Sequence, residues 1–305
     1  MKETIIKFGP KKNLLGIVSN PDTTIDNSPV AIMLNTGVIN RVGPYQLHVD
    51  IARGLANAGF RAVRMDMSSF GDSAVREDAD NSDEASLKDL RDAFDALGEK
   101  YGATKFVLIG LCSGAYRAHT IAHTDPRVIG LISMDGITFQ TSAVLRYAVT
   151  ERLLNWGYWK NQLRLLSYRR QGVRLRSPDK PNFVRVQIKL LISNILKKLN
   201  RKSSQSSFAE AALLTDELDR KAVLKEQEIM LGRGTQMLYI YSGGLPYFTT
   251  EKQFTEMFER TPNKNFQLSI YPNANHTFML IEDRKALVNE ITTWHQTRFS
   301  NQNKI

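Results

Sequence analysis

The segment that most constrains how this chain can fold is residues 106–119, which read FVLIGLCSGAYRAH. The apolar run before the first glycine predicts a strand, and the residues after Cys112 predict a helix. Between them lies a GxCxG pattern, Gly110 to Gly114, typical of a nucleophile elbow, a sharp turn beside which only very small residues fit. Cys112 is the only cysteine in the chain. Because free cysteines are often buried small hydrophobic residues, the segment alone leaves both interpretations open.

Predicted strands and helices alternate through the first part of the chain. The predicted strands cover residues 4–9, 14–20, 30–37, 61–67, 105–111 and 128–135. Helices are predicted after the third, fourth and fifth of these strands; the first ends at Gly59 and the second begins near Asn81. Such alternation predicts a mainly parallel sheet covered by helices on both faces.

The same pattern resumes at residue 236. Strands are predicted over 236–243 and 266–272, with a helix over about 250–260 between them. A closing helix is expected to bury four apolar residues along one side, namely Leu280, Leu287, Ile291 and Trp294. Residues 138–235 do not follow this alternation, so we predict a core formed by 1–137 and 236–305 with an inserted helical lid over 138–235.

The predicted insertion carries most of the positive charge. Residues 139–225 contain 18 Lys and Arg against 6 Asp and Glu, whereas the whole chain has a net charge of +10. Solvated surface charge is the ordinary explanation, but so uneven a distribution favours an anionic partner. We expect coenzyme A or an acyl carrier protein, or peripheral contact with an anionic membrane, with Arg169, Arg170, Arg174 and Arg176 as substrate-binding residues. No nucleic-acid-binding module accompanies the charge, which disfavours nucleic acid.

Composition and hydropathy predict a cytoplasmic protein. The single cysteine allows no internal disulfide, which fits a reducing compartment. No apolar run is long enough for a membrane span, and the first residues, MKETIIKFGP, have no hydrophobic signal core. We predict neither a metal nor an organic cofactor.

The order of motifs along the chain resembles the α/β-hydrolase superfamily. The resemblance rests on an NTG turn after the third strand, MDMSSFGDS after the fourth, GLCSGA at the elbow and NANHTF after the last strand, and it covers the chain outside the insertion. More narrowly, the chain is similar to the serine-aminopeptidase-like branch, including hydrolases found beside exosortase and exopolysaccharide systems, some of which carry cysteine at the elbow. The resemblance implies an α/β-hydrolase fold with a mainly parallel eight-stranded sheet.

A nucleophile of this type needs a nearby base. Of the five histidines, His276 alone follows a late strand in a loop of turn residues, where the resemblance places the superfamily's catalytic histidine. Cys112 then becomes the expected nucleophile. A cysteine beside an imidazole and at a helix N-terminus has a depressed pKa, so a thiolate is expected near neutral pH.

The acid that would orient His276 is less direct to assign. Many relatives carry it after the seventh strand, but here the first carboxylate in that region is Glu251, inside the following predicted helix. Asp135 ends the preceding strand, and in the superfamily's usual sheet order an acid there reaches the histidine loop. Asp135 is also explained as a turn residue before Gly136, and a Cys112–His276 dyad without an acid stays possible.

The oxyanion hole is expected to consist of backbone N–H groups. The resemblance implies that of Ser113, after the nucleophile, and one from the NTG turn, at Val38. Since only the N–H of Ser113 is used, we expect its replacement by alanine to leave most activity. Asp66 and Asp72 are interpreted as loop residues that hold the rim of the site.

Three functions of different classes remain open at this stage. The first is an acyl hydrolase that cleaves an ester or thioester through a Cys112 acyl-enzyme. The second is an acyltransferase that passes the acyl group from a thioester carrier to an alcohol or amine. The third is a non-catalytic protein that binds an acyl ligand, which the missing late acid makes conceivable.

Overall fold

The computed structural model describes residues 1–139, 219–243 and 250–300. By its internal contacts the chain divides into two compact units. The first comprises Met1–Val144 and Leu218–Ile305, and the second comprises Leu145–Glu217. The second unit lies wholly outside the described residues, and so does most of the predicted insertion, including the four arginines. The predicted boundaries of that insertion therefore stay a prediction.

Eight strands form one sheet in the order β1-β2-β4-β3-β5-β6-β7-β8. The strands are β1 (Lys2–Phe8), β2 (Leu14–Asn20), β3 (Val30–Met33), β4 (Ala62–Asp66), β5 (Phe106–Leu111), β6 (Val128–Met134), β7 (Gln236–Ser242) and β8 (Phe266–Tyr271). β2 pairs with β1 and β4 in antiparallel fashion, and all later neighbours pair in parallel. The predicted eight-stranded, mainly parallel sheet is confirmed.

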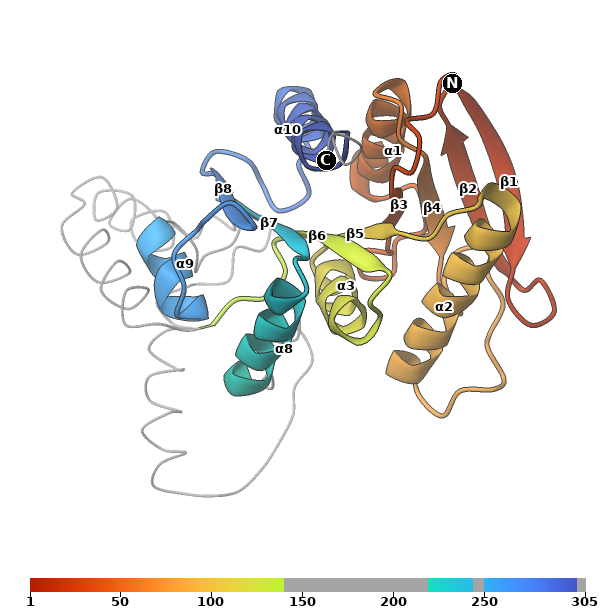
Figure 1. Ribbon diagram of the computed structural model, residues 1–305, viewed down its shortest axis with the longest axis horizontal. Helices are drawn as coiled ribbons and strands as arrows, with labels where there is room; N and C mark the ends of the chain where they lie inside the picture. Colours follow the sequence, from red (N-terminus) through yellow and green to blue (C-terminus); the bar gives the residue numbers. More distant parts are fainter. Residues whose placement is uncertain (140–218, 244–249, 301–305) are drawn as a thin grey trace, which may run out of the picture. The chain divides into compact units, whose positions relative to one another are not determined.

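Helices cover both faces of the sheet, as predicted. They are α1 (Leu47–Asn57), α2 (Ser82–Tyr101), α3 (Ser113–Thr124), α8 (Arg220–Gly232), α9 (Glu251–Phe258) and α10 (Ile281–Phe299), with a short 3-10 turn at Pro44–Gln46. Figure 1 shows α1 and α10 on one side of the strands and α2, α3 and α8 on the other. None of the helices in the described ranges is long and apolar enough to cross a membrane.

The strands separate two hydrophobic cores because successive side chains point to opposite faces. In β3, Ile32 lies in the core beneath α2, α3, α8 and α9, whereas Ala31 and Met33 lie in the core beneath α1 and α10. Such strands are apolar throughout, since neither face meets water. The result is a rigid sheet whose parallel strands all end at one edge, where their loops can meet.

Two local predictions differ from the structure. The closing helix buries Leu287, Ile291 and Trp294 as expected, but Leu280 is the N-cap of α10 and is 53% exposed. Periodicity extended the apolar stripe one turn too far, because Leu280 precedes the first helical residue and points away from the buried face. In addition, helix α8 lies within the sequence range predicted as insertion, yet it contacts α3 of the core.

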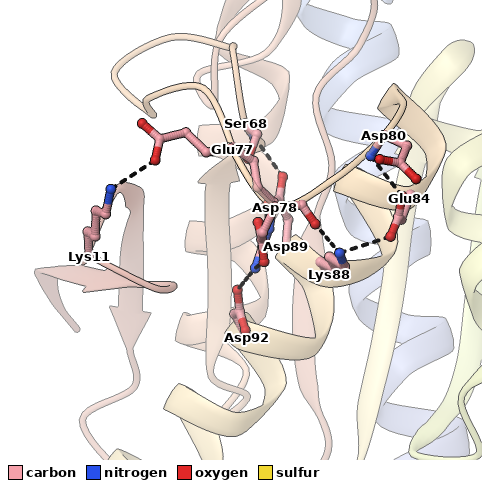
Figure 2. A network of polar contacts seen from close by, with 10 residues as sticks. Lys11, Ser68, Glu77, Asp78, Asp80, Glu84, Lys88, Asp89 and Asp92 are labelled. Carbon is pink, nitrogen blue, oxygen red and sulfur yellow. Dashed lines mark hydrogen bonds and ion pairs between the residues drawn. The ribbon is translucent and has the colours of Figure 1, made fainter.

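A buried ion-pair network fixes the loop after β4 to helix α2. The guanidinium of Arg76 contacts carboxylate oxygens of Asp78 (2.7 Å), Asp89 (2.7 Å) and Asp92 (2.6 Å). Asp89 also accepts hydrogen bonds from the backbone N–H and the hydroxyl of Ser68, both at 2.7 Å. Figure 2 shows how Ser68, Asp89 and Asp92 lie together, with the surface pairs of Lys11 and Lys88 around them. The loop after β4 is thus held in place by ion pairs within the protein itself.

Candidate active site

Cys112 lies at the sharp turn between β5 and α3. Its backbone has φ 56° and ψ −120°, a conformation that non-glycine residues rarely adopt and that stores strain. The flanking glycines are required by close packing. A Cβ on Gly110 would lie 2.2 Å from the carbonyl oxygen of Gly114, and one on Gly114 would lie 2.6 Å from that of Asn35. The GxCxG pattern therefore has the geometry of the predicted elbow.

Three of the predicted site residues come together at the carboxyl edge of the sheet. Asp135, which directly follows β6, has an oxygen (Oδ2) 2.9 Å from Nδ1 of His276. His276 lies in the loop after β8 and also hydrogen-bonds to Cys112. Asp135 is 3% exposed, whereas Cys112 is only partly buried. The arrangement is a line of carboxylate, imidazole and thiol that runs from a buried group to a partly buried one.

Electrostatics in this line favour charge separation. The hydrogen bond from His276 lowers the pKa of the Cys112 thiol, with the neighbouring imidazolium charge and the Ser113 N–H acting in the same direction. Burial alone would lower the pKa of His276, but its bonds to Asp135 and Cys112 raise that pKa to about 10. Both shifts favour a thiolate paired with an imidazolium, the reactive form of a cysteine nucleophile.

Ser242, the last residue of β7, is a partner that the sequence reasoning missed. Its backbone N–H and its hydroxyl donate to the two carboxylate oxygens of Asp135, at 2.7 and 2.6 Å. β7 pairs with β6, and the N–H of Asp135 donates to the carbonyl of Ile240 at 2.8 Å. A small hydroxyl residue at the tip of the strand next to an expected acid is the signal that could have identified it.

The predicted oxyanion donors belong to two segments, the elbow for Ser113 and the turn after β3 for Val38. Val38 is in the turn after β3, which is closed by a hydrogen bond from the Ile39 N–H to the Thr36 carbonyl (3.0 Å). Among the described residues, the N–H of Val38 has no acceptor. The hydroxyl of Ser113 accepts a hydrogen bond from the N–H of Gly37 at 2.8 Å. The side chain of Ser113 therefore has a contact of its own, in addition to the expected role of its backbone N–H.

Asp66 holds the base of this turn. Its buried carboxylate accepts hydrogen bonds from the side chain of Asn35 (3.1 Å) and from the backbone N–H of Arg41 (2.6 Å) and Asp72 (3.2 Å). The side chain of Arg41 forms ion pairs with both Asp66 and Asp72. These contacts agree with the prediction that the two aspartates shape the rim.

The remaining candidates lie apart from this line. Glu251 is the exposed first residue of α9. His119 is buried on α3 and contacts Glu226 of α8 at 2.9 Å. In the described ranges, no group of three or more metal-ligating side chains is close enough to hold an ion. The proposed anion-binding residues, Arg169, Arg170, Arg174 and Arg176, fall outside the described residues.

Comparisons with known proteins agree with this architecture. A family model described as alpha/beta hydrolase fold matches residues 31–229. No curated protein sequence matches the chain. Among solved structures, the chain is similar to the alpha/beta hydrolase GrgF from Penicillium sp. sh18, with a TM-score of 0.57 and 15% identity over 98% of this chain and 100% of that one.

Two further solved structures show the same fold. Pyrococcus furiosus esterase Pf2001 has a TM-score of 0.58 and 13% identity, covering 98% of this chain and 91% of that one. XC6422 from Xanthomonas campestris, described as an a/b serine hydrolase without lid, has a TM-score of 0.53 and 14% identity over 98% and 96% of the two chains. Likeness at this identity concerns the fold. Because the family model matches residues 31–229, more than half of the chain, the chain belongs to the alpha/beta hydrolase fold family.

Proposed function

We propose that this protein is an acyl hydrolase that cleaves an ester or thioester through an acyl-enzyme on Cys112. The observation that carries the proposal is the hydrogen-bonded line from Asp135 through His276 to Cys112 at the strained elbow. The shifted pKa values of Cys112 and His276 support the same assignment, since perturbed titration gathers at functional sites. The family supports an enzyme, and ester or thioester cleavage is the chemistry that these three groups suit.

In this mechanism the Cys112 sulfur, as thiolate, attacks the substrate carbonyl carbon. A C–S bond forms, and the carbonyl π electrons move to the oxygen, where the N–H groups of Ser113 and Val38 donate to the oxyanion. Collapse of this intermediate breaks the bond to the leaving group, which takes a proton from the His276 imidazolium. Water then attacks the thioester, His276 accepts its proton, and the acid is released together with the thiolate.

Asp135 has two tasks in this scheme. Its bond to Nδ1 fixes the imidazole tautomer and leaves Nε2 for the sulfur, and its charge stabilises the imidazolium. Its position after β6, in place of the commoner one after β7, is compensated by the donors of Ser242. The acid is thereby held at the strand tip that adjoins the histidine loop.

Sequence features support a narrower assignment. The GLCSGA and MDMSSFGDS segments favour the serine-aminopeptidase-like branch with cysteine at the elbow. The positive charge of residues 139–225 favours a substrate on an anionic carrier, such as coenzyme A or an acyl carrier protein.

The test is acylation of the protein by a chromogenic ester and by an acyl-coenzyme A, followed by mass spectrometry. We expect an adduct on Cys112, its loss in Cys112→Ala, and slow formation in His276→Ala. His123→Ala is the matched control, because His123 lies at the far end of α3, where its nearest carboxylate, Glu226, is 3.8 Å away. An adduct on a serine would remove Cys112 from the nucleophile role.

Product analysis separates the other functions. Release of free acid in the presence of an alcohol or amine acceptor supports hydrolysis, whereas transfer to the acceptor would identify an acyltransferase. Absence of any adduct with tight binding of the acyl compound would identify a binding protein.

A further inference from the structure

Ser113 contributes two groups to the candidate site, and the second has no role in the scheme above. Its backbone N–H lies next to the Cys112 sulfur, and its hydroxyl accepts the N–H of Gly37 from the turn after β3 at 2.8 Å. One residue thus connects the elbow to the turn that carries the other oxyanion donor.

The base of that turn and its tip are held differently. At the base, Asn35 donates to the carbonyl of Ile39 (3.0 Å) and accepts the N–H of Met67 (2.8 Å). At the tip, Val38 is 90% exposed, so packing does not restrain it. Gly37 is also exposed, with φ +54°, and a Cβ there would find no atom within 4 Å. Within the described residues, the Ser113 hydroxyl makes the only hydrogen bond between this tip and the elbow.

We propose that the hydroxyl of Ser113 is a positioning group that holds the Gly37–Val38 tip so that the N–H groups of Ser113 and Val38 converge on one oxyanion. The inference rests on the proposed function. Its physical basis is that oxyanion donors act only when they are already aimed at the developing charge, since reorganisation during the reaction costs the stabilisation. The turn is closed on itself by the bond from Ile39 to Thr36, but one hydrogen bond ties its tip to the elbow, so the loss of that bond frees Val38 to move relative to Ser113.

The test compares Ser113→Ala with the wild-type protein on an activated ester. We expect kcat to fall about 10- to 100-fold with little change in KM, which is part of the 10²- to 10³-fold effect of losing an oxyanion donor outright. Ser113→Thr keeps the hydroxyl and should restore most of the rate. Ser133→Ala is the matched control, because this buried hydroxyl lies on β6 opposite Gly110 and has no partner in the described part of the chain.

A second reaction separates positioning from general damage to the site. Alkylation of Cys112 by iodoacetamide forms no oxyanion, so Ser113→Ala should keep the wild-type alkylation rate while losing ester turnover. Equal losses in both reactions, or unchanged kcat on the ester, would overturn the proposal.

Hydrogen exchange makes the test independent of turnover. In Ser113→Ala the amide of Gly37, which donates to this hydroxyl, should exchange faster, while that of Met67 at the base of the turn should not change. If the wild-type protein forms no acyl adduct but this exchange pattern appears, the proposed function fails and the anchoring of the tip stands. Unchanged exchange at Gly37 would overturn the anchoring itself.

Discussion

Two buried carboxylates in this protein each accept two hydrogen bonds from one serine, an arrangement that we call a serine clamp. They differ in the third group that donates to them. Asp89 accepts the N–H and the hydroxyl of Ser68, and Asp135 accepts the N–H and the hydroxyl of Ser242. The third donor is Arg76 at 2.7 Å for Asp89 and His276 at 2.9 Å for Asp135. The comparison isolates what the third partner contributes.

The difference lies in whether the cation can give up its proton. Arg76 is charged at every accessible pH: burial opposes its charge, but bonds to three carboxylates raise its pKa further. His276 has a pKa raised to about 10, and its other side faces the Cys112 thiol. The same local geometry therefore holds a permanent cation beside Asp89, whereas beside Asp135 it holds a cation that can lose its proton, as the proposed function requires.

The largest effect expected from this comparison comes from replacing each acid. Asp135→Asn should lower kcat by up to about 10⁴-fold, the loss known for a serine triad, and by less with a thiolate. Asp89→Asn should keep kcat and lower the free energy of unfolding by about 3 kcal/mol, because it leaves part of a buried cation unpaired. Ester turnover measures kcat and denaturant unfolding measures the stability of each variant. If Asp135→Asn lost stability but kept its kcat, the two carboxylates would not differ in function.

Mild losses of kcat on the ester for both Asp135→Asn and Glu251→Gln would have a different meaning. They would remove the acid from the mechanism and leave a Cys112–His276 dyad.

The next effect is on the pH dependence of alkylation and turnover. We expect it to come from the Asp135–His276 pair and not from the Asp89–Arg76 pair, because only His276 can lose its proton. Alkylation of Cys112 should rise with pH as the thiolate forms, at a pKa below that of an ordinary thiol. Turnover should fall again as His276 loses its proton near pH 10, since the leaving group then lacks a proton donor. His276→Gln should slow alkylation at pH 7 by up to about 30-fold, because an unassisted thiol is only a few per cent ionised there.

Rates of iodoacetamide alkylation and ester turnover between pH 5 and pH 11 would measure both limbs. If the alkylation rate of His276→Gln rises over the same pH range as that of the wild-type protein, the histidine does not control the ionisation of the thiol.

A smaller effect is expected from the two serines of the clamps. Ser242→Ala removes one hydrogen bond to the carboxylate of Asp135 and should lower kcat about 10-fold, in line with 1.5–3 kcal/mol for a bond to a charged group. Ser68→Ala should leave kcat unchanged and reduce the free energy of unfolding by a similar amount. Steady-state kinetics and thermal unfolding of the two variants would test this. An equal loss of kcat in Ser242→Ala and Ser68→Ala would mean that the two clamps do not differ in function.

The smallest effect should come from Glu251, the acid at the commoner place in the sequence. It is exposed at the first turn of α9, so Glu251→Gln should change kcat by less than about twofold. A loss larger than that of Asp135→Asn, with unchanged circular dichroism, would restore the commoner order of the triad.

Much of the fold follows from local patterns. The elbow, the strands around it and the buried side of the closing helix at Leu287, Ile291 and Trp294 were predictable, because apolar spacing reflects which side of a strand or helix is buried. Leu280 was not, because a spacing rule does not locate the first residue of a helix. The choice of Asp135 over Glu251 depended on the sheet order implied by the family resemblance rather than on spacing.

Local sequence is enough to specify which short segments become strands, helices and the glycine-flanked turn, since these depend on neighbours only a few residues away. The tertiary structure decided which polar groups meet. Asp135 and His276 are 141 residues apart, and their contact requires β6, β7 and β8 to lie side by side in one register. The hydroxyl of Ser113 reaches Gly37 only because β3 and β5 are neighbours whose loops leave the same edge of the sheet. Contacts of this kind depend on the order and register of strands, which no local pattern contains.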